Sequence, residues 1–214
     1  MLSPKVPVAQ EGYPFIAVVA FLTLIAAIYS LPCLTIIGIL LTVFVTLFFR
    51  DPERVAPSDP SQIVSPADGK IIIAEQVPAS LYTDGPALKV SIFMNVFNVH
   101  VNRVPTSGTV QKVLYKPGKF YAADSQKGAL QNECCATVLQ LESGRQMAFV
   151  QIAGLIARRI VCWLEPKDTV VQGHRFGLIR FGSRVDVYLP ADTRLTVKIG
   201  DKVRAGETVI GSLS

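Results

Sequence analysis

The sequence predicts a mainly β domain preceded by an N-terminal pair of membrane-associated helices. Three observations predict this fold class. Residues 12–49 form a run of 38 residues without Asp, Glu, Lys or Arg, in a chain of 214 residues that is 17% charged overall. Short apolar segments punctuated by Gly and Pro then recur from residue 70 onward. After Arg50, no window of 12 or more residues has a persuasive helical period.

The uncharged run predicts two helices. It is too long for the apolar core of a signal peptide, and no A-x-A-like cleavage site follows it before Arg50. A single helix of this length would extend roughly 57 Å, about twice the hydrocarbon thickness of a bilayer. Proline disfavours a helical conformation at the residue before it, so we expect a break at Ser30-Leu31-Pro32. The helices should then cover residues 14–29 and 33–49.

Each predicted helix is at the lower limit of length for crossing a bilayer. A tight hairpin or a re-entrant pair is therefore expected, and whether it spans the bilayer or only dips into it stays open. A buried pair of core helices is the alternative. Lys5 precedes the helices and Arg50 and Arg54 follow them, so the positive-inside bias places both ends, and the domain that follows, on the cytoplasmic side of the cell membrane.

We expect three regions along the chain: a hydrophobic membrane-associated segment over 1–49, a proline-rich linker over 50–66, and a β-rich domain over 67–214. A short helix can form within 120–132. The predicted strands are short, apolar and bounded by turn residues, and they cover 70–75, 87–93, 109–115, 136–141, 147–153, 159–164, 184–189 and 194–198.

Composition narrows the class of protein. Disorder, a collagen-like fibre and a disulfide mini-scaffold are excluded by the ordinary charge and apolar content of residues 50–214. The net charge of +5 belongs to this region, which suits an anionic lipid surface. Its Lys and Arg residues are scattered without an aromatic platform, so we expect no nucleic-acid partner. The four cysteines lack ligand spacing, so we expect no metal and reduced thiols.

One short internal repeat refines the predicted fold. A D-x-V-x-x-G frame begins at Asp168 and again at Asp201, 33 residues later. The second copy, VKIGDKVRAGETVIG, looks like the tight hairpin of lipoyl or biotinyl domains, which predicts a barrel-sandwich-like β domain. The chain has no exposed hairpin tip with the lysine that carries the prosthetic group in such domains. A carrier role is therefore only an alternative.

The candidates for proton transfer are few, because the chain has two histidines, His100 and His174. Alternation in FNVHVNRVP predicts a strand with Asn98, His100 and Asn102 on one polar face. A solvent-facing strand histidine is the alternative for His100, and a turn residue is the expectation for His174. Asp68 lies in SPADGK, where Asp-Gly by itself indicates only a tight turn.

Gly182-Ser183 is a candidate site of backbone chemistry. It lies in RFGSRVDVYLP, ahead of an alternating strand. A serine hydroxyl held against the carbonyl of a preceding glycine can attack its own peptide bond, because glycine tolerates a strained geometry. Gly-Ser is common in loops, so the dipeptide gains weight only from its context.

The chain resembles the short bacterial phosphatidylserine decarboxylase proenzymes. The resemblance runs from about residue 48 to the C-terminus, and an apolar N-terminal segment is also typical of that family. It rests on six segments in the same order and spacing, namely FFRDPER (48–54), SPADG (65–69), FNVHVNRVP (97–105), KPGKF (116–120), VQIAGLIARRIVCW (150–163) and GSRVDVYLP (182–190).

The resemblance implies an enzyme that makes its own pyruvoyl cofactor, without a metal and without pyridoxal phosphate. Ser183 would attack the Gly182 carbonyl, and cleavage would give a β chain of residues 1–182 and an α chain of residues 183–214, which together form a heterodimer. Ser183 would become an N-terminal pyruvoyl group that forms a Schiff base with the substrate amine and accepts electrons as carbon dioxide leaves. The substrate would be phosphatidylserine in the membrane and the product phosphatidylethanolamine.

The resemblance also implies roles for other residues. His100 would be the proton donor or the partner of the substrate carboxylate, and Asp68 would act in self-cleavage. Larger family members have a second histidine where this chain has Arg103, so the cleavage base stays open between His100 and water with backbone geometry. They also carry Ser or Thr after the cleavage serine, where this chain has Arg184.

Arg158 and Arg159 follow an apolar run and are candidates for the lipid phosphate, with a solvated strand edge as the alternative. Two functional alternatives remain beside phosphatidylserine decarboxylation. One is a decarboxylase of another serine-headgroup lipid. The other is a non-enzymatic, membrane-bound barrel-sandwich carrier or adaptor.

Overall fold

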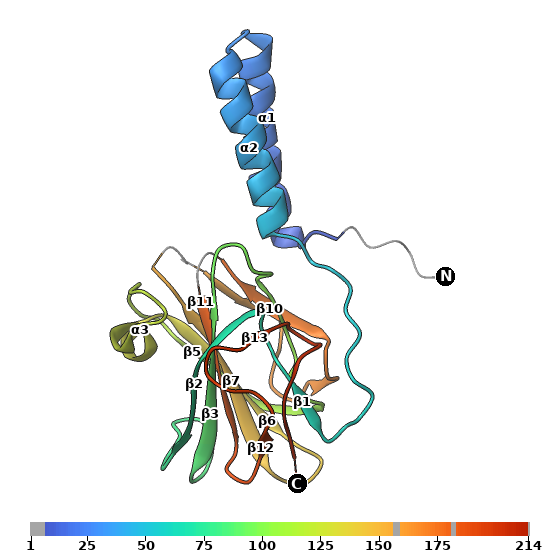
Figure 1. The fold of residues 1–214 in the computed structure, drawn as a ribbon, viewed down its shortest axis with the longest axis vertical. Coiled ribbons are helices and arrows are strands. Elements are labelled where there is room, and N and C mark those ends of the chain that lie inside the picture. Colours follow the sequence, from blue (N-terminus) through green and yellow to red (C-terminus); the bar gives the residue numbers. More distant parts are fainter. Residues whose placement is uncertain (1–6, 156–158, 181–182, 214) are drawn as a thin grey trace. The chain divides into compact units, whose positions relative to one another are not determined.

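The computed structural model describes residues 7–155, 159–180 and 183–213, and its contacts divide the chain into two units, Met1–Glu53 and Arg54–Ser214 (Figure 1). The first unit is helical and the second consists mainly of strands. The prediction of a mainly β chain with an N-terminal helical pair is confirmed.

The helical unit is an antiparallel hairpin. A short 3-10 helix (Gln10–Gly12) leads into α1 (Tyr13–Ile28), and α2 (Pro32–Phe48) follows. Ser30, with a φ of 52°, forms the turn between them ahead of Pro32, at the predicted break. The two helices approach closely at Gly38, where a Cβ atom would lie 2.4 Å from Oγ1 of Thr23. A glycine here allows the helices to pack together.

The hairpin keeps most of its apolar side chains at its own surface. No α1 residue is buried, and in α2 only Val45 and Phe48 are. Residues 10–28 are long and apolar enough to cross a membrane, while α2 is shorter. Such a surface is stable in contact with lipid and not in contact with water.

The β unit is built around one antiparallel sheet of eight strands (Figure 1). β11 (Ser183–Pro190) lies near its centre, between β3 (Ala87–Met94) and β7 (Gln146–Ala153). On the β3 side the sheet continues through β2 (Gly69–Val77) to β13 (Lys202–Val203), and on the β7 side through β6 (Cys134–Gln140) and β5 (Gly108–Lys116) to β9 (Thr169–Val170).

Two smaller sheets close the core of this unit. One has the order β1 (Gln62–Val64), β14 (Val209–Ser212), β12 (Arg194–Leu195), and the other the order β4 (Val101–Arg103), β10 (Arg175–Ile179), β8 (Ile160–Cys162). Buried side chains from all three sheets, such as Ile63, Phe149 and Phe176, form one hydrophobic cluster. A short helix, α3 (Gln126–Gln131), lies within the predicted range 120–132.

Candidate active site

Ser183 is the first residue of the central strand β11. It pairs with Met94 of β3 on one side and with Ala153 of β7 on the other, and it is fully buried. Two neighbouring strands therefore fix the backbone of Ser183. Its predicted cleavage partner, Gly182, lies outside the described residues.

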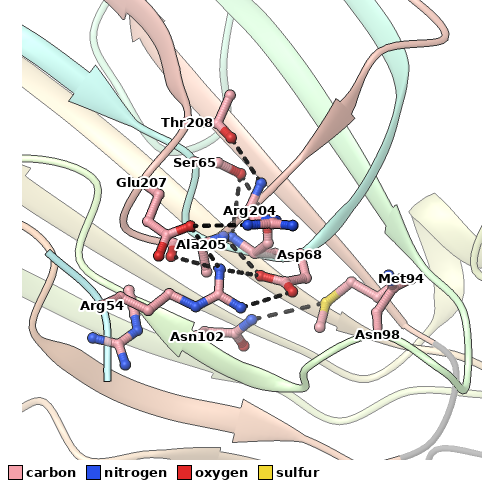
Figure 2. A network of polar contacts seen from close by, with 12 residues as sticks. Arg54, Ser65, Asp68, Met94, Asn98, Asn102, Arg204, Ala205, Glu207 and Thr208 are labelled. Carbon is pink, nitrogen blue, oxygen red and sulfur yellow. Dashed lines mark hydrogen bonds and ion pairs between the residues drawn. The ribbon is translucent and has the colours of Figure 1, made fainter. Parts of the chain in front are cut away.

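A buried chain of polar side chains leads from Ser183 into the core. The Ser183 hydroxyl donates to Sδ of Met94 at 3.4 Å, and Nδ2 of Asn102 donates to the same sulfur at 3.8 Å (the second contact is drawn in Figure 2). Nε2 of Gln151 donates to Oδ1 of Asn102 at 2.9 Å. Methionine sulfur is a weak acceptor, so the contact that the described residues offer to the hydroxyl of Ser183 is a weak one.

Sequence reasoning had placed Asn102 on a polar stripe but had missed Met94 and Gln151. The signal for Gln151 was available, because it is the one polar residue inside the apolar run MAFVQIA of β7. A buried amide inside such a run needs a partner, and that partner is Asn102.

His100 lies beside the segment that leads to Ser183. It precedes β4, after a turn over residues 95–98, so the predicted strand through residues 98–102 is wrong in its first half. Val99 and His100 are both buried, because the chain bends there and does not alternate between two faces. The backbone N–H of Ile179, four residues before Ser183, donates to the His100 carbonyl at 3.4 Å.

The contacts of His100 define its tautomer. Nδ1 lies 2.9 Å from the backbone carbonyl of Asn98. A carbonyl oxygen only accepts, so Nδ1 carries the hydrogen, and in the neutral form of the ring Nε2 would be the acceptor nitrogen. That arrangement suits a group that takes up or returns a proton through Nε2.

Asp68 is buried in a polar network with a residue of the linker (Figure 2). Its Oδ2 accepts from Nη2 of Arg54 at 2.9 Å, and its Oδ1 accepts from the backbone N–H of Ala205 at 2.8 Å. Nη1 of Arg54 lies 2.9 Å from Oδ1 of Asp68 and 3.9 Å from Glu207. The sequence analysis considered Arg54 only as a positive charge that follows the helices. The residues around Arg54 in the sequence do not indicate that its partner lies fourteen residues away.

Strand register places Asp68 at the same end of the sheet as Ser183. Lys70 of β2 pairs with Phe93 of β3, and Phe93 pairs with Arg184 of β11. Asp68 and Ser183 each lie just before those paired residues. The structure thus brings Ser183, His100 and Asp68 to one end of the β unit.

Arg103 is the residue for which the sequence resemblance implied a second histidine in larger proteins. Its Nη1 donates to the carbonyl of Gly173 at 2.8 Å, and its side chain is buried so closely against Gly206 that a Cβ there would lie 2.7 Å from Cδ. A guanidinium has no acceptor, so Arg103 does not replace a histidine as a base. His174 is exposed in the same turn, as expected of a turn residue.

Arg184 points away from the core face that holds Ser183, because successive residues of a strand alternate. It is buried and donates to Asp186 and, at 2.9 Å, to Oγ of Ser91, while Lys89 pairs with Asp186 at 3.2 Å. This charged cluster fixes the first residues of β11 to β3 from the opposite face.

The two arginines predicted to bind the lipid phosphate are only partly described. Arg158 lies outside the described residues. Arg159 is exposed, and its carbonyl accepts from the N–H of Arg180 at 3.3 Å. Arg159 therefore lies beside the segment that leads to Ser183, at the same end of the sheet.

Two thiols lie next to the polar chain. Cys135 pairs with Gln151 across β6 and β7, and its thiol is hydrogen-bonded to Cys162 of β8. This bond lowers the pKa of Cys162 to about 7 and, together with burial, raises the pKa of Cys135. Among the described residues no group of His, Cys, Asp and Glu is arranged to hold a metal ion.

The fold and the site define a β-domain protein that carries an apolar helical hairpin and a buried serine, histidine and carboxylate at one end of its sheet. The sequence profile of the phosphatidylserine decarboxylase family matches residues 41–211. The chain belongs to this family.

Curated relatives match this chain over its whole length. The phosphatidylserine decarboxylase proenzyme of Desulfotalea psychrophila is 62% identical over 213 residues, which cover 100% of both chains. The proenzymes of Geotalea uraniireducens and Pelobacter propionicus are 46% and 49% identical, again over 100% of both chains.

Proposed function

We propose that this protein is a carboxy-lyase that converts phosphatidylserine to phosphatidylethanolamine and that it is made as a proenzyme. Self-cleavage between Gly182 and Ser183 would yield a β chain of residues 1–182 and an α chain of residues 183–214. The observation that carries the proposal is the position of Ser183, a buried hydroxyl on the first residue of the central strand.

Self-cleavage requires a hydroxyl that is free to attack. Ser183 Oγ adds to the Gly182 carbonyl, the peptide bond breaks, and the Gly182 acyl group passes from nitrogen to oxygen as an ester. β-Elimination then releases the β chain as a carboxylate, and hydrolysis with loss of ammonia leaves a pyruvoyl group at position 183. The weak sulfur acceptor of Met94 leaves the Ser183 oxygen electron pairs available for the first step.

The surroundings of Ser183 fit a pyruvoyl group. β3 and β7 hold the backbone of residue 183 on both sides, and the Arg184 cluster holds the next residue, so a new chain end would keep its place. Once formed, the group supplies a ketone that accepts electrons as carbon dioxide leaves. Asn102 and Gln151 supply buried, neutral hydrogen-bonding groups close by.

The other residues of the site have proton-handling and binding roles in this proposal. His100 returns a proton to the substrate carbon through Nε2 after decarboxylation, with Nδ1 held by Asn98. Asp68 acts in self-cleavage, where Arg54 and the Ala205 N–H fix its carboxylate. Arg159, and Arg158 beside it in sequence, attract the phosphate of the substrate.

The helical hairpin suits a lipid substrate. Both acyl chains of the substrate stay in the bilayer while its serine headgroup enters the site, so a protein attached to the membrane meets its substrate where it is concentrated. We place the protein at the cell membrane with its β domain on the cytoplasmic side, on the charge bias of Lys5, Arg50 and Arg54.

Intact-mass measurement of the purified protein tests the proposal. We expect two chains, produced by cleavage after residue 182, and a hydroxylamine-sensitive carbonyl on the α chain. The Ser183→Ala variant should stay one chain, carry no carbonyl and have no activity on phosphatidylserine. An active preparation that consists of one uncleaved chain of 23.2 kDa would refute the proposal.

A further inference from the structure

We propose that the end of the β domain that carries Ser183 docks directly on an anionic lipid bilayer, through apolar side chains surrounded by cations. This inference rests on the proposed function, because it assumes a substrate that lies in the bilayer. It concerns the β domain by itself, in addition to the attachment that the helical hairpin provides.

The apolar part of this surface consists of three exposed side chains. Phe97, Leu130 and Leu155 are 73%, 71% and 65% exposed. Phe97 lies in the turn after β3, Leu155 follows β7, and Leu130 lies in α3, ahead of β6.

Strand register places the segments that carry these three side chains at the Ser183 end of the sheet. Ser183 begins β11 opposite Met94 and Ala153, the last residues of β3 and β7. Cys134, the first residue of β6, pairs with Ile152 of β7. The segments that carry the exposed side chains therefore leave the sheet at the end where Ser183 lies. The three side chains are not part of the buried hydrophobic cluster of the domain.

Charge favours an anionic bilayer as the occupant. Among the described residues of 95–100, 116–133 and 154–159, the exposed charges are one carboxylate, Asp124, and four cations, Lys116, Lys119, Lys127 and Arg159. Apolar side chains that enter the headgroup region, with cations around them, are the usual composition of an interfacial membrane-binding surface.

The other end of the sheet has the opposite charge balance. The loops over 78–86, 141–145 and 191–193 carry Asp84, Glu142 and Asp192 and a single cation, Arg145, which pairs with Asp192 at 2.7 Å. That end also has an exposed apolar residue, Leu81, which is 90% exposed. The contrast predicts that only the Ser183 end meets an anionic surface, and it makes Leu81 a matched control.

Tryptophan quenching in the full chain tests this orientation. Trp163 is the only tryptophan, so Phe97→Trp and Leu81→Trp are each made in a Trp163→Phe background. Both proteins are reconstituted in vesicles of phosphatidylglycerol and phosphatidylcholine that carry bromine on their acyl chains. We expect a blue shift and quenching for Phe97→Trp and neither for Leu81→Trp. Equal quenching of both, or quenching of neither, overturns the inference.

Activity gives a second, independent readout. The double variant Phe97→Ser, Leu155→Ser should lose about tenfold in kcat/KM toward long-chain phosphatidylserine in vesicles, since each side chain loses its transfer into lipid. It should keep its activity toward a short-chain phosphatidylserine that dissolves as monomers, and Leu81→Ser should match the wild type on both substrates. Unchanged activity on vesicles, or equal loss on both substrates, contradicts docking. Failure of the proposed function is distinguishable, because the wild type would then be inactive on both.

Discussion

At the residue scale, the ion pair between Asp68 and Arg54 can be separated from a role of Asp68 in self-cleavage. Both side chains are buried and joined by two contacts of 2.9 Å. Asp68→Asn leaves the Arg54 guanidinium with the more distant carboxylate of Glu207, at 3.9 Å, and Arg54→Gln leaves the buried Asp68 carboxylate without this cation. Each change costs about 3 kcal/mol of unfolding free energy. Because only Asp68→Asn removes the proposed catalytic group, we expect it to stay one chain while Arg54→Gln is still cleaved.

Urea unfolding followed by Trp163 fluorescence measures the stability of both variants, and mass measurement gives the extent of cleavage. The two variants act as each other's control, because one removes the carboxylate and the other the guanidinium of the same ion pair. If both are cleaved to the same extent, Asp68 serves only to hold Arg54.

Residues of the candidate site were predictable from the sequence only where a residue carried its own signal. Ser183, His100 and Asp68 occur in distinctive segments, and the structure places them at one end of the sheet. Met94 and Gln151 have ordinary strand neighbours, and their contacts with Ser183 and Asn102 join residues 89 and 49 positions apart. Such contacts depend on sheet register, which local patterns do not specify.

At the element scale, the long strands and the helices were predictable. Some short strands, such as β8 and β12, also lie within predicted ranges, and others were missed. Strands such as β2, β3 and β7 have eight or nine residues, enough to show an apolar pattern between turn residues. The helices follow from the uncharged run and Pro32. Several missed strands, namely β1, β9 and β13, have only two or three residues and form through their partners.

A substitution of Gly69 tests whether the start of β2 supports the candidate site. A Cβ at this position would lie 2.1 Å from the carbonyl oxygen of Phe93, which is backbone in the neighbouring strand and has no room to move. Gly69→Ala should therefore separate β2 from β3 beside Asp68, cost about 3 kcal/mol of unfolding free energy, and slow self-cleavage. Urea unfolding and the cleaved fraction over time measure the two effects.

Gly85→Ala is the control for this substitution. Gly85 has a φ of 78°, but a Cβ at this position would have no atom within 4 Å, so only backbone strain opposes the change. We expect a loss of about 1 kcal/mol and normal cleavage. If Gly69→Ala behaves like Gly85→Ala, the close approach of β2 and β3 does not matter for the site.

At the scale of the whole molecule, the proposed cleavage would leave strands of the α chain paired with strands of the β chain. β11 pairs with β3 and β7, β13 pairs with β2, and β14 pairs with β1, so each of these three α-chain strands has a β-chain partner. None of these pairs requires the peptide bond between residues 182 and 183. The two chains should therefore stay together as one particle in the absence of denaturant.

Refolding distinguishes the cleaved protein from its precursor. Once urea separates the chains, recovery of the cleaved protein must begin with a bimolecular encounter, whereas the Ser183→Ala precursor keeps β11 tethered at a high effective concentration. We expect the yield of refolded protein in detergent to rise with protein concentration for the cleaved form and to be insensitive to it for the precursor. Trp163, which belongs to the β chain, reports the recovery of native fluorescence in both. The same concentration dependence in the two proteins would mean that β11 is not the element that joins the two chains, because tethering it would then make no difference.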